Sequence, residues 1–268
     1  VYYFRGAVEN NYVYFAGFYW RIVRINEDGS VRLIYQGKTP DAMFSEALIG
    51  QIPFNNNTED NAYVGYMYGT PGSNSYEDTH ANINDSVVKV ELDNWYEQNL
   101  LPYNFYIADS GFCGDRSIYK EEELGLGYGK HETLYGSGAR VKTSHQPQFK
   151  CPQQNDLYTL KNNEKGNSAL KYPIGLITLD EQVYAGAQMD IENITYYLYI
   201  NAWYLTMSPF DFNGTYATVG VVSSVSRLQR GYLSLTDRGV RPVINLTPDV
   251  KIISGDGTKN NPYTIQLD

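Results

Sequence analysis

The stretch of sequence that decides the fold covers residues 203–246. It opens with WYLTMSP at 203–209 and closes with RGVRPVINL at 238–246. The residues between these two motifs are rich in Ser, Tyr, Thr, Val, Gly and Arg, and they contain no evident catalytic constellation. A regular frame around an aromatic and hydroxyl-rich centre is typical of a contact surface. The sequence therefore predicts a display region at 203–246 and not an active site.

The display region supplies the candidate ligand-binding residues. Aromatic and Arg side chains are frequent anchors of binding surfaces, and Ser side chains add adaptable hydrogen bonds. The alternative is an ordinary solvated β-hairpin in which the same side chains bind nothing. The residues expected to contact a ligand are Phe210, Asp211, Phe212, Tyr216, Ser223, Ser226, Arg227, Gln229, Arg230, Tyr232 and Ser234.

The frame of the display region is expected to be structural. Gly239 permits a tight turn, and Pro242 limits strand pairing because it lacks a backbone N–H. Arg241 is expected to anchor a carboxylate or loop carbonyls, and Trp203 to fill the core beneath the display region. With the two cysteines, the predicted structural set is Cys113, Cys151, Trp203, Gly239, Arg241 and Pro242.

Short strands are predicted at both ends of the chain. Alternating apolar residues at 12–16, 19–25 and 31–35 indicate a β-meander within residues 1–36, with a hairpin turn at Asp28-Gly29. Towards the C-terminus the same reasoning predicts strands at 219–226, 231–235, 240–246, 250–253 and 263–267.

Two helices are predicted between these ends. Asn84 or Asp85 is expected to cap a helix that runs to about Leu100. Thr178 and Glu181 have the spacing of a capping box, which predicts a second helix that continues to Ala187. The polar and Gly-rich segments 37–83 and 103–171 are expected to form loop-rich inserts on the surface. The prediction is one α+β domain, 1–268, with two main helices, short strands and long loops.

Composition narrows the class of partner. The chain has 268 residues, 42% of them hydrophobic, and a formal net charge of −9. An acidic chain without a basic run argues against nucleic acid and against direct contact with an anionic membrane. The 26 tyrosines have two explanations that stay open here: a binding surface, or a β-rich fold that favours aromatic residues.

The two cysteines, Cys113 and Cys151, suggest a single disulfide and an oxidising compartment, with two free thiols as the alternative. The sequence shows no zinc-type spacing, and no cofactor or metal is expected. It also shows no secretory leader and no apolar run of membrane-spanning length. We expect any leader or surface anchor to lie outside this sequence.

Catalytic chemistry has little support in the sequence. A carboxylate pair of the glycosidase type needs two acids in one cleft, and nothing marks such a pair. His131 and His145 have no nucleophile motif around them. Asp109, Asp115, Asp256 and Asn260 could supply calcium ligands, but no loop has the calcium-binding pattern, so a plain turn is expected at Asp256-Gly257. Asp115 and Arg116 are expected to form a buried pair.

Several motifs together resemble a family of bacterial surface-protein domains of unknown function that is common in gut bacteria. They occur in a fixed order: YWRIVRI at 19–25 with DGS at 28–30, FCGDRS at 112–117 with FKC at 149–151, YPIGLIT at 172–178 with DE at 180–181, and TMSP at 206–209 with GVRP at 239–242. The resemblance covers nearly the whole chain. It implies a C-type-lectin-like fold of the formylglycine-generating-enzyme subtype.

The resemblance also carries an expectation about function. The same fold is used by the variable proteins of diversity-generating retroelements, in which a C-terminal stretch is mutated inside a fixed frame; here that stretch would be 210–234. Formylglycine-generating chemistry needs a cysteine pair near the C-terminal face, and this chain has no cysteine after Cys151. The departure argues against that activity.

The predicted function is therefore non-enzymatic binding. We expect an extracellular or cell-surface-anchored bacterial domain that binds a host or bacterial surface protein or glycan through residues 203–246. Two alternatives remain: a structural module of a surface fibre or stalk, and, with less support, a carbohydrate-active enzyme.

Overall fold

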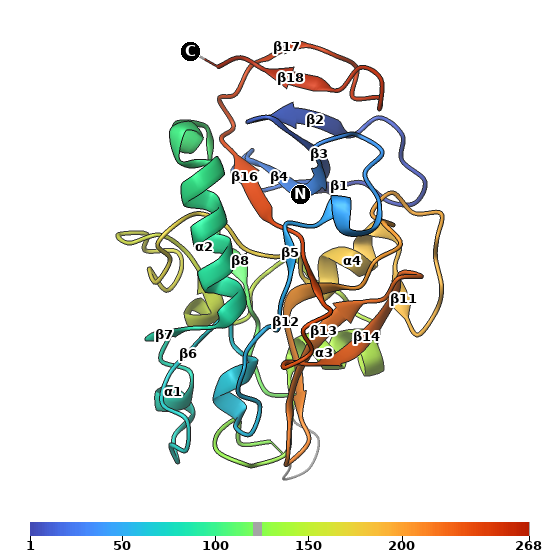
Figure 1. Ribbon diagram of the computed structural model, residues 1–268. Coiled ribbons are helices and arrows are strands. Elements are labelled where there is room, and N and C mark those ends of the chain that lie inside the picture. The colour runs from blue at the N-terminus through green and yellow to red at the C-terminus, as the bar shows by residue number, and fades with distance from the viewer. Residues whose placement is uncertain (120–124, 268) are drawn as a thin grey trace.

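Two β-sheets dominate the structure, a computed structural model that describes residues 1–119 and 125–267 (Figure 1). The strands of the first sheet come from both ends of the chain, and β1 joins it beside β3. In order across this sheet they are β16 (Val243–Leu246), β4 (Val31–Gly37), β3 (Phe18–Ile25), β2 (Tyr12–Phe15), β18 (Tyr263–Ile265) and β17 (Ile252–Ser254), with β1 at Tyr2–Tyr3.

The second sheet contains the display region. Its longest strand, β12, was not anticipated as a strand, because its nine residues are buried on both faces and so do not alternate. In order across the sheet the strands are β11 (Gln188–Met189), β14 (Arg227–Tyr232), β13 (Ala217–Val222), β12 (Tyr204–Phe212), β15 (Gly239–Val240) and β5 (Gly50–Gln51), with β9 (Thr133–Leu134) beside β12.

The N-terminal meander forms as predicted. Strands β2, β3 and β4 pair antiparallel in sequence, and Gly29 has a φ of +82° in the turn between β3 and β4. Trp20, Leu33 and Ile34 are fully buried. The C-terminal strand β16 then pairs antiparallel with β4, so the two ends of the chain form one sheet.

The chain passes from the second sheet to the first at Arg241-Pro242. Residues 239–240 belong to β15 and residues 243–246 to β16, so the two residues between them link the sheets. Pro242 has no N–H to donate, and its carbonyl accepts a hydrogen bond from Tyr35 N at 2.9 Å. Pro242 therefore lies at the junction of the two sheets and takes part in pairing with β4 only as an acceptor.

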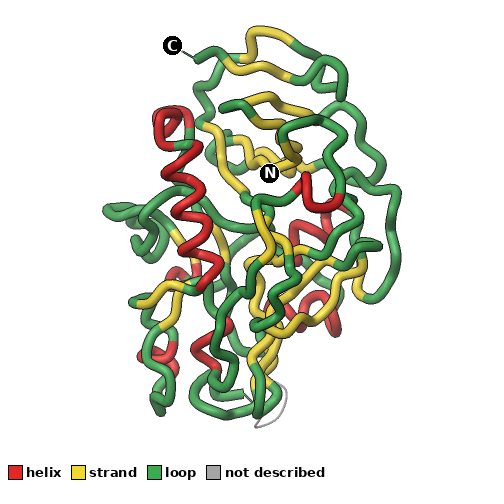
Figure 2. Tube along the Cα trace, viewed as in Figure 1, coloured by secondary structure: helices red, strands yellow, loops and turns green. Residues whose placement is uncertain are grey.

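Both predicted main helices are present (Figure 2). Helix α2 (Val87–Asn99) begins one or two residues later than expected: Ser86 is its N-cap, and Asn84 and Asp85 form the short strand β7 instead. Helix α4 (Leu179–Ala185) has the predicted capping box of Thr178 and Glu181. It ends at Gly186, whose φ of +124° suits glycine. Figure 1 shows α2 along one side of the molecule.

The inserts consist of short pieces of structure joined by irregular chain, and residues 120–124 of the second insert lie outside the described residues. Two small two-stranded antiparallel sheets pair β6 with β7 and β8 with β10. The short elements are β6 (Met67–Tyr68), β7 (Asn84–Asp85), β8 (Phe112–Cys113), β10 (Leu157–Tyr158), α1 (Tyr76–Thr79), α3 (Gly136–Ala139), the π-helical turn Arg140–Ser144, and the 3-10 turns Phe44–Ala47, Asn61–Val64, Leu101–Tyr106 and Gln154–Asp156.

The expectation that the inserts lie only on the surface is wrong. Phe54, Tyr66, Tyr135 and Tyr158 are each fully buried in the hydrophobic core. Their backbone is kept in the interior by polar side chains: the Asn61 amide donates to the carbonyls of three residues of the second insert, at 2.8 to 3.3 Å. Buried polar groups with partners allow irregular chain to enter a core.

The elements described above make this an α+β protein with few helices.

Candidate functional site

The display region is a three-stranded antiparallel unit, and only its outer strand faces solvent. Strands β12 and β13 are buried at every position, whereas in β14 only Leu228 and Gly231 are buried. Gly220 of β13 lies so close to Leu179 of α4 that a Cβ would come within 2.5 Å of the leucine side chain. Packing against α4 therefore covers the middle of the sheet and leaves β14 accessible.

Five of the eleven predicted ligand-binding residues are interior residues, which corrects their assignment as direct contacts. Phe210 and Phe212 are 1% exposed, and Asp211 is 9% exposed. Ser223 and Ser226 are 3% and 2% exposed and build the turn between β13 and β14. The Ser223 hydroxyl accepts a hydrogen bond from Arg227 N at 3.0 Å. Most of these side chains pack within the hairpin, and only Asp211 and Phe212 reach the wall of a groove.

The remaining six residues are accessible to solvent, on β14 or next to it, and we call this set the β14 face. Tyr216 and Tyr232 are 45% and 43% exposed, and their rings meet edge to face with centroids 5.9 Å apart. Arg230 and Ser234 are exposed, and Arg227 and Gln229 are half-buried. The β14 face consists of Tyr216, Arg227, Gln229, Arg230, Tyr232 and Ser234.

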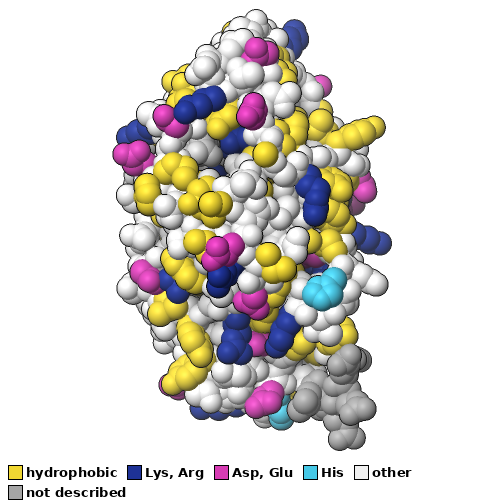
Figure 3. Space-filling model, turned by 90° about the vertical axis from the view of Figure 1, so that its right-hand side faces the viewer, with side chains coloured by type: hydrophobic (Ala, Val, Ile, Leu, Met, Phe, Trp, Pro, Cys, Tyr) yellow, Lys and Arg dark blue, Asp and Glu magenta, His cyan; other side chains and the backbone are white. Residues whose placement is uncertain are grey.

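Polar partners run along the β14 face. Arg227 forms an ion pair with Glu192, and Gln229 donates to Asp190 at 3.4 Å. Arg230 forms an ion pair with Asp211 at 3.1 Å. On the side of the molecule turned towards the viewer in Figure 3, acidic and basic side chains are interspersed with hydrophobic ones. Sequence analysis missed Asp190 and Glu192, because only the pairing of β11 with β14 brings them there.

A groove with a volume of about 300 Å³ lies at the end of β12. Asp211 and Asn213 line one part of it, and Glu132 and Lys142 line another. The pairing of β9 with β12 brings these distant segments together. No motif marks Glu132 or Lys142 in the sequence, so only the folded chain reveals them as neighbours of the display region.

The predicted structural residues differ in how closely the structure matches their roles. Arg241 is fully buried and donates to the carbonyls of Tyr35 and Leu198, each at 2.8 Å, as expected for an anchor of carbonyls. Gly239 lies in β15, where a Cβ would come within 2.4 Å of Leu48; close packing, not a tight turn, requires glycine there. Trp203 is half-buried at the rim, beneath the guanidinium of Arg238, rather than in the core.

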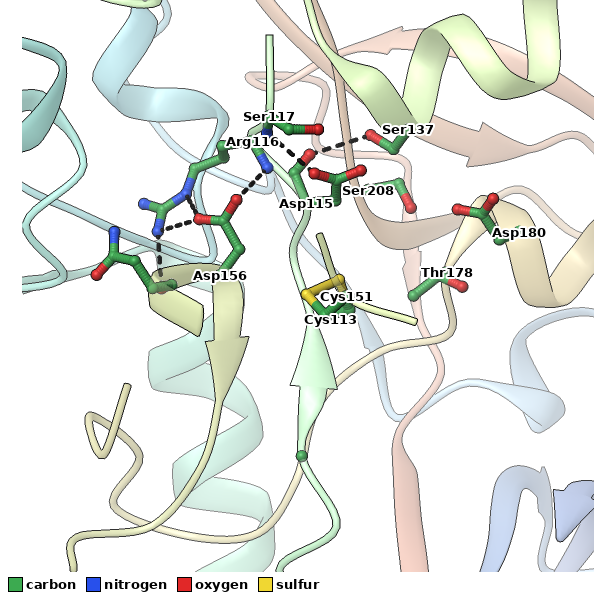
Figure 4. The surroundings of a disulfide bond; sticks show 12 residues. Cys113, Asp115, Arg116, Ser117, Ser137, Cys151, Asp156, Thr178, Asp180 and Ser208 are labelled. Carbon is green, nitrogen blue, oxygen red and sulfur yellow. Dashed lines mark hydrogen bonds and ion pairs between the residues drawn. A yellow bond between two sulfur atoms is a disulfide. The ribbon is translucent and has the colours of Figure 1, made fainter. Parts of the chain in front are cut away.

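The disulfide between Cys113 and Cys151 is present, with Cα atoms 5.5 Å apart (Figure 4). A charged cluster surrounds it, but the pairing differs from the prediction. Arg116 pairs with Asp156, and both side chains are fully buried. Asp115 pairs instead with Arg140, which also contacts Asp180. The predicted Asp115–Arg116 pair is therefore wrong, although both residues are buried.

A second group of buried charges lies at the start of α4. The Glu181 carboxylate contacts Arg24 at 2.9 Å and Arg32 at 2.5 Å. Burial raises the pKa of Glu181, but Arg32, Arg24 and the Thr178 N–H favour the carboxylate more strongly, so its pKa lies below the usual value. Burial lowers the pKa of Arg32 to about 10, so this guanidinium stays charged at neutral pH.

These charges line one small cavity beside the disulfide. Asp115, Asp180 and Glu181 supply carboxylates to its wall, and each is paired with an arginine. The volume is about 20 Å³, which is room for about one water molecule. A sugar ring does not fit this space, so the cavity is not suited to cleave a glycosidic bond. The contacts around this cavity are ion pairs within the protein, as in a cluster that stabilises the fold.

Two other features, a metal-binding cluster and a membrane-spanning helix, are absent from the described residues. Across residues 1–119 and 125–267, no group of three or more His, Cys, Asp or Glu side chains is arranged to hold a metal ion. Over the same part of the chain, no helix combines the length and apolar character needed to cross a membrane. At Asp256-Gly257 the Asp256 carboxylate accepts hydrogen bonds from Thr258, as in a plain turn.

Comparison of the chain with protein-family models, with curated proteins and with solved structures found no match. The assignment of a function therefore depends on the geometry of the sites described above.

Proposed function

We propose that this chain is a non-enzymatic extracellular domain that binds a protein or glycan through the β14 face. One observation carries the proposal: two large aromatic rings, Tyr216 in the turn before β13 and Tyr232 at the end of β14, stay exposed side by side next to two fully buried strands. Exposed tyrosines offer a flat apolar surface and a hydroxyl with little rotamer entropy to lose. Such pairs suit the C–H faces of sugars or the apolar side chains of a protein.

The charged residues of the β14 face support a role in orientation. The side chains of Arg227 and Glu192 are 40% and 55% exposed, so water screens their ion pair and a ligand can replace either partner at low cost. Arg230 is held by the mostly buried Asp211, which fixes its direction. Together they form a polar rim beside an aromatic anchor, as binding surfaces commonly do.

The proposal includes a fold and a family. We propose the C-type-lectin-like fold of the formylglycine-generating-enzyme subtype, in the family of bacterial surface domains named above. The capped entry into α4 after residues 172–178 and the C-terminal sheet support it. If copies of the protein are diversified by a retroelement, substitutions should gather at the six residues of the β14 face and spare β12 and β13, which are buried.

The disulfide supports the proposed location. A disulfide persists in oxidising surroundings and is rare where cellular thiols keep cysteines reduced. The pair Cys113–Cys151 therefore fits a domain that works outside the bacterial cytosol, anchored at the cell surface or released from it.

A screen on glycan and host-surface-protein arrays tests the proposal. The unchanged domain is compared with a variant that combines Tyr216→Ala, Arg227→Ala and Tyr232→Ala. The matched control is Tyr14→Ala with Tyr19→Ala, since these tyrosines form another cross-strand pair with rings 5.1 Å apart, on the first sheet. We expect the arrays to identify a ligand that the control variant still binds and the β14 variant does not. Circular dichroism should show that both variants are folded.

Two results would contradict the proposal. Equal binding by the β14 variant would place the site elsewhere. Absence of binding by the unchanged domain on every array would favour a structural module of a surface fibre, in which Tyr216 and Tyr232 only pack against a neighbouring subunit.

A further inference from the structure

A groove on another part of the molecule gathers lysines in a chain that is acidic overall. It lies between the start of α2 and the loop at 160–171 and has a volume of about 530 Å³. Lys89, Lys161 and Lys171 line it together with one acidic residue, Asp85, and Met67, Leu160 and Leu170 supply apolar surface. The volume falls in the range of about 300–1,000 Å³ that small-molecule sites occupy. Lysines thus outnumber acids on this wall, although the chain has a formal net charge of −9.

Lys89 occupies a position that helix stability does not favour. It lies in the first turn of α2, three residues after the N-cap Ser86, where the helix dipole favours an acidic residue. Its side chain is 2% exposed, and burial of an ammonium group is costly. A residue that breaks local rules in this way, on the wall of a groove, is typical of a functional position.

The described partners of Lys89 account for only part of the hydrogen-bonding capacity of its ammonium group. Nζ donates to Asp93 Oδ2 at 2.7 Å and forms an ion pair with Asp85 Oδ1 at 3.3 Å. An ammonium has three N–H groups. Two carboxylates therefore account for two of them, and a ligand in the groove can accept from the third. The other oxygen of Asp93 is buried without a hydrogen-bond partner among the described residues.

The opposite wall carries cations that a ligand can reach easily. Lys161 is exposed. The side chain of Lys171 is 58% exposed and contacts Glu97 at 3.1 Å, and that glutamate is 50% exposed. An exposed pair of this kind contributes little to stability, so an incoming anion can take the place of Glu97.

We propose that this groove binds a sugar that carries carboxylate groups, such as a short oligosaccharide of uronic acids. Lys89 holds one carboxylate at the base of the groove, and Lys161 and Lys171 hold neighbouring carboxylates at the rim. The surface of Met67, Leu160 and Leu170 contacts the C–H face of the sugar rings. This site is separate from the β14 face and does not depend on the function proposed for it.

Isothermal titration of the intact domain with trigalacturonate tests the site. The matched ligand is the same trisaccharide with its carboxyl groups reduced to alcohols. We expect trigalacturonate to bind with a Kd of about 1 mM or tighter and the reduced trisaccharide to show no binding. Lys161→Gln with Lys171→Gln should weaken binding at least about tenfold, because two charge-assisted contacts are lost. The control, Lys38→Gln with Lys251→Gln, removes two exposed lysines elsewhere and should leave the affinity unchanged.

Lys89 is tested separately, since it is buried. Lys89→Met with Asp93→Asn removes both charges of the buried pair, so that no isolated buried carboxylate remains. This variant should fold, as judged by circular dichroism and thermal unfolding, yet lose binding of trigalacturonate. Three results would overturn the proposal: no binding of trigalacturonate by the unchanged domain, equal binding of the carboxyl-reduced trisaccharide, or full affinity in the Lys161→Gln, Lys171→Gln variant. Binding of a polyglutamate peptide in the absence of trigalacturonate binding would also overturn it, because the ligand would then be a peptide.

Discussion

The charges beside the disulfide and those along the β14 face use the same residue types in opposite environments. Arg32 and Glu181 have side chains that are 1% and 2% exposed, whereas those of Arg227 and Glu192 are 40% and 55% exposed. Removal of one partner from a buried pair leaves a charge without solvation, while water compensates an exposed one. The first region therefore maintains the fold, and the second is free to exchange its partners for a ligand.

The tyrosines likewise form a buried group and an exposed group. Tyr135 and Tyr196 are buried, and their hydroxyls donate to Asn61 Oδ1 and Gln182 Oε1. Tyr216 and Tyr232 keep their rings in solvent. The high tyrosine content is therefore explained in part by a core that contains irregular chain and needs large residues with a polar end, while the exposed pair is available for the contact role proposed for the β14 face.

The largest effect is expected at Glu181. Glu181→Gln removes the carboxylate that Arg24 and Arg32 share and leaves two largely buried guanidiniums without an anion. We expect the free energy of unfolding at pH 7 to fall by about 3–5 kcal/mol, measured by urea denaturation. The matched control is Glu192→Gln on the β14 face, with an expected change within about 0.5 kcal/mol. Similar losses in the two variants would remove the distinction between the regions.

The effect of Glu181→Gln should depend on pH. The pKa of Glu181 is lowered in the folded protein. Its stabilising contribution is therefore complete above the unfolded-state pKa of about 4.3 and is lost as the pH falls through the lower folded-state pKa. The two proteins should differ in unfolding free energy at pH 7 and converge in acid. A difference that stays constant down to acid pH would show that the ionised carboxylate does not stabilise the fold.

The next largest effect is expected from removal of the disulfide. Cys113→Ala with Cys151→Ala opens a loop with a sequence separation of 38 residues. In the chain-entropy description this lowers the free energy of unfolding by about 4 kcal/mol. Urea denaturation measures the loss, and hydrogen exchange should show faster opening within residues 113–151 than in the β2–β4 sheet. Free thiols in protein produced under oxidising conditions, detected by intact mass, would contradict the bond itself.

Arg241→Ala should have a smaller effect than Glu181→Gln, although both side chains are buried. The groups that Arg241 contacts are neutral carbonyls and the Gln36 amide, so its removal leaves unsatisfied acceptors but no isolated charge. We expect a loss of about 2–3 kcal/mol in thermal or urea unfolding. Binding to any ligand of the β14 face should persist in the folded variant. Normal stability combined with lost binding would make Arg241 a contact residue instead of an anchor.

Local patterns in the sequence predicted the elements whose causes are local. The β2–β4 meander follows from alternation with a turn at Asp28-Gly29, and the capping box at Thr178 follows from spacing alone. The exact cap of α2 was missed because Asn84, Asp85 and Ser86 are all good caps, and only the pairing of β6 with β7 selects Ser86.

The candidate site could be predicted only in part, because it depends on contacts between distant segments. The display region was located, but β12 shows no alternation, so Phe210 and Phe212 could not be recognised as interior residues. Asp190 and Glu192 reach the β14 face through the parallel pairing of β11 with β14. The partners of Asp115 and Arg116 are likewise set by Arg140 and Asp156, which are distant in sequence.

The smallest effect is expected for the exposed pair of the β14 face. A double-mutant cycle with Arg227→Ala and Glu192→Ala should give a coupling energy of about 0.5 kcal/mol or less in urea denaturation, and less in high salt, since both side chains are largely in solvent. The same Arg227→Ala change should weaken binding of a β14-face ligand if Arg227 orients it. A coupling energy well above 1 kcal/mol would mean that the pair holds the hairpin, and the β14 face would then resemble the charged cluster beside the disulfide.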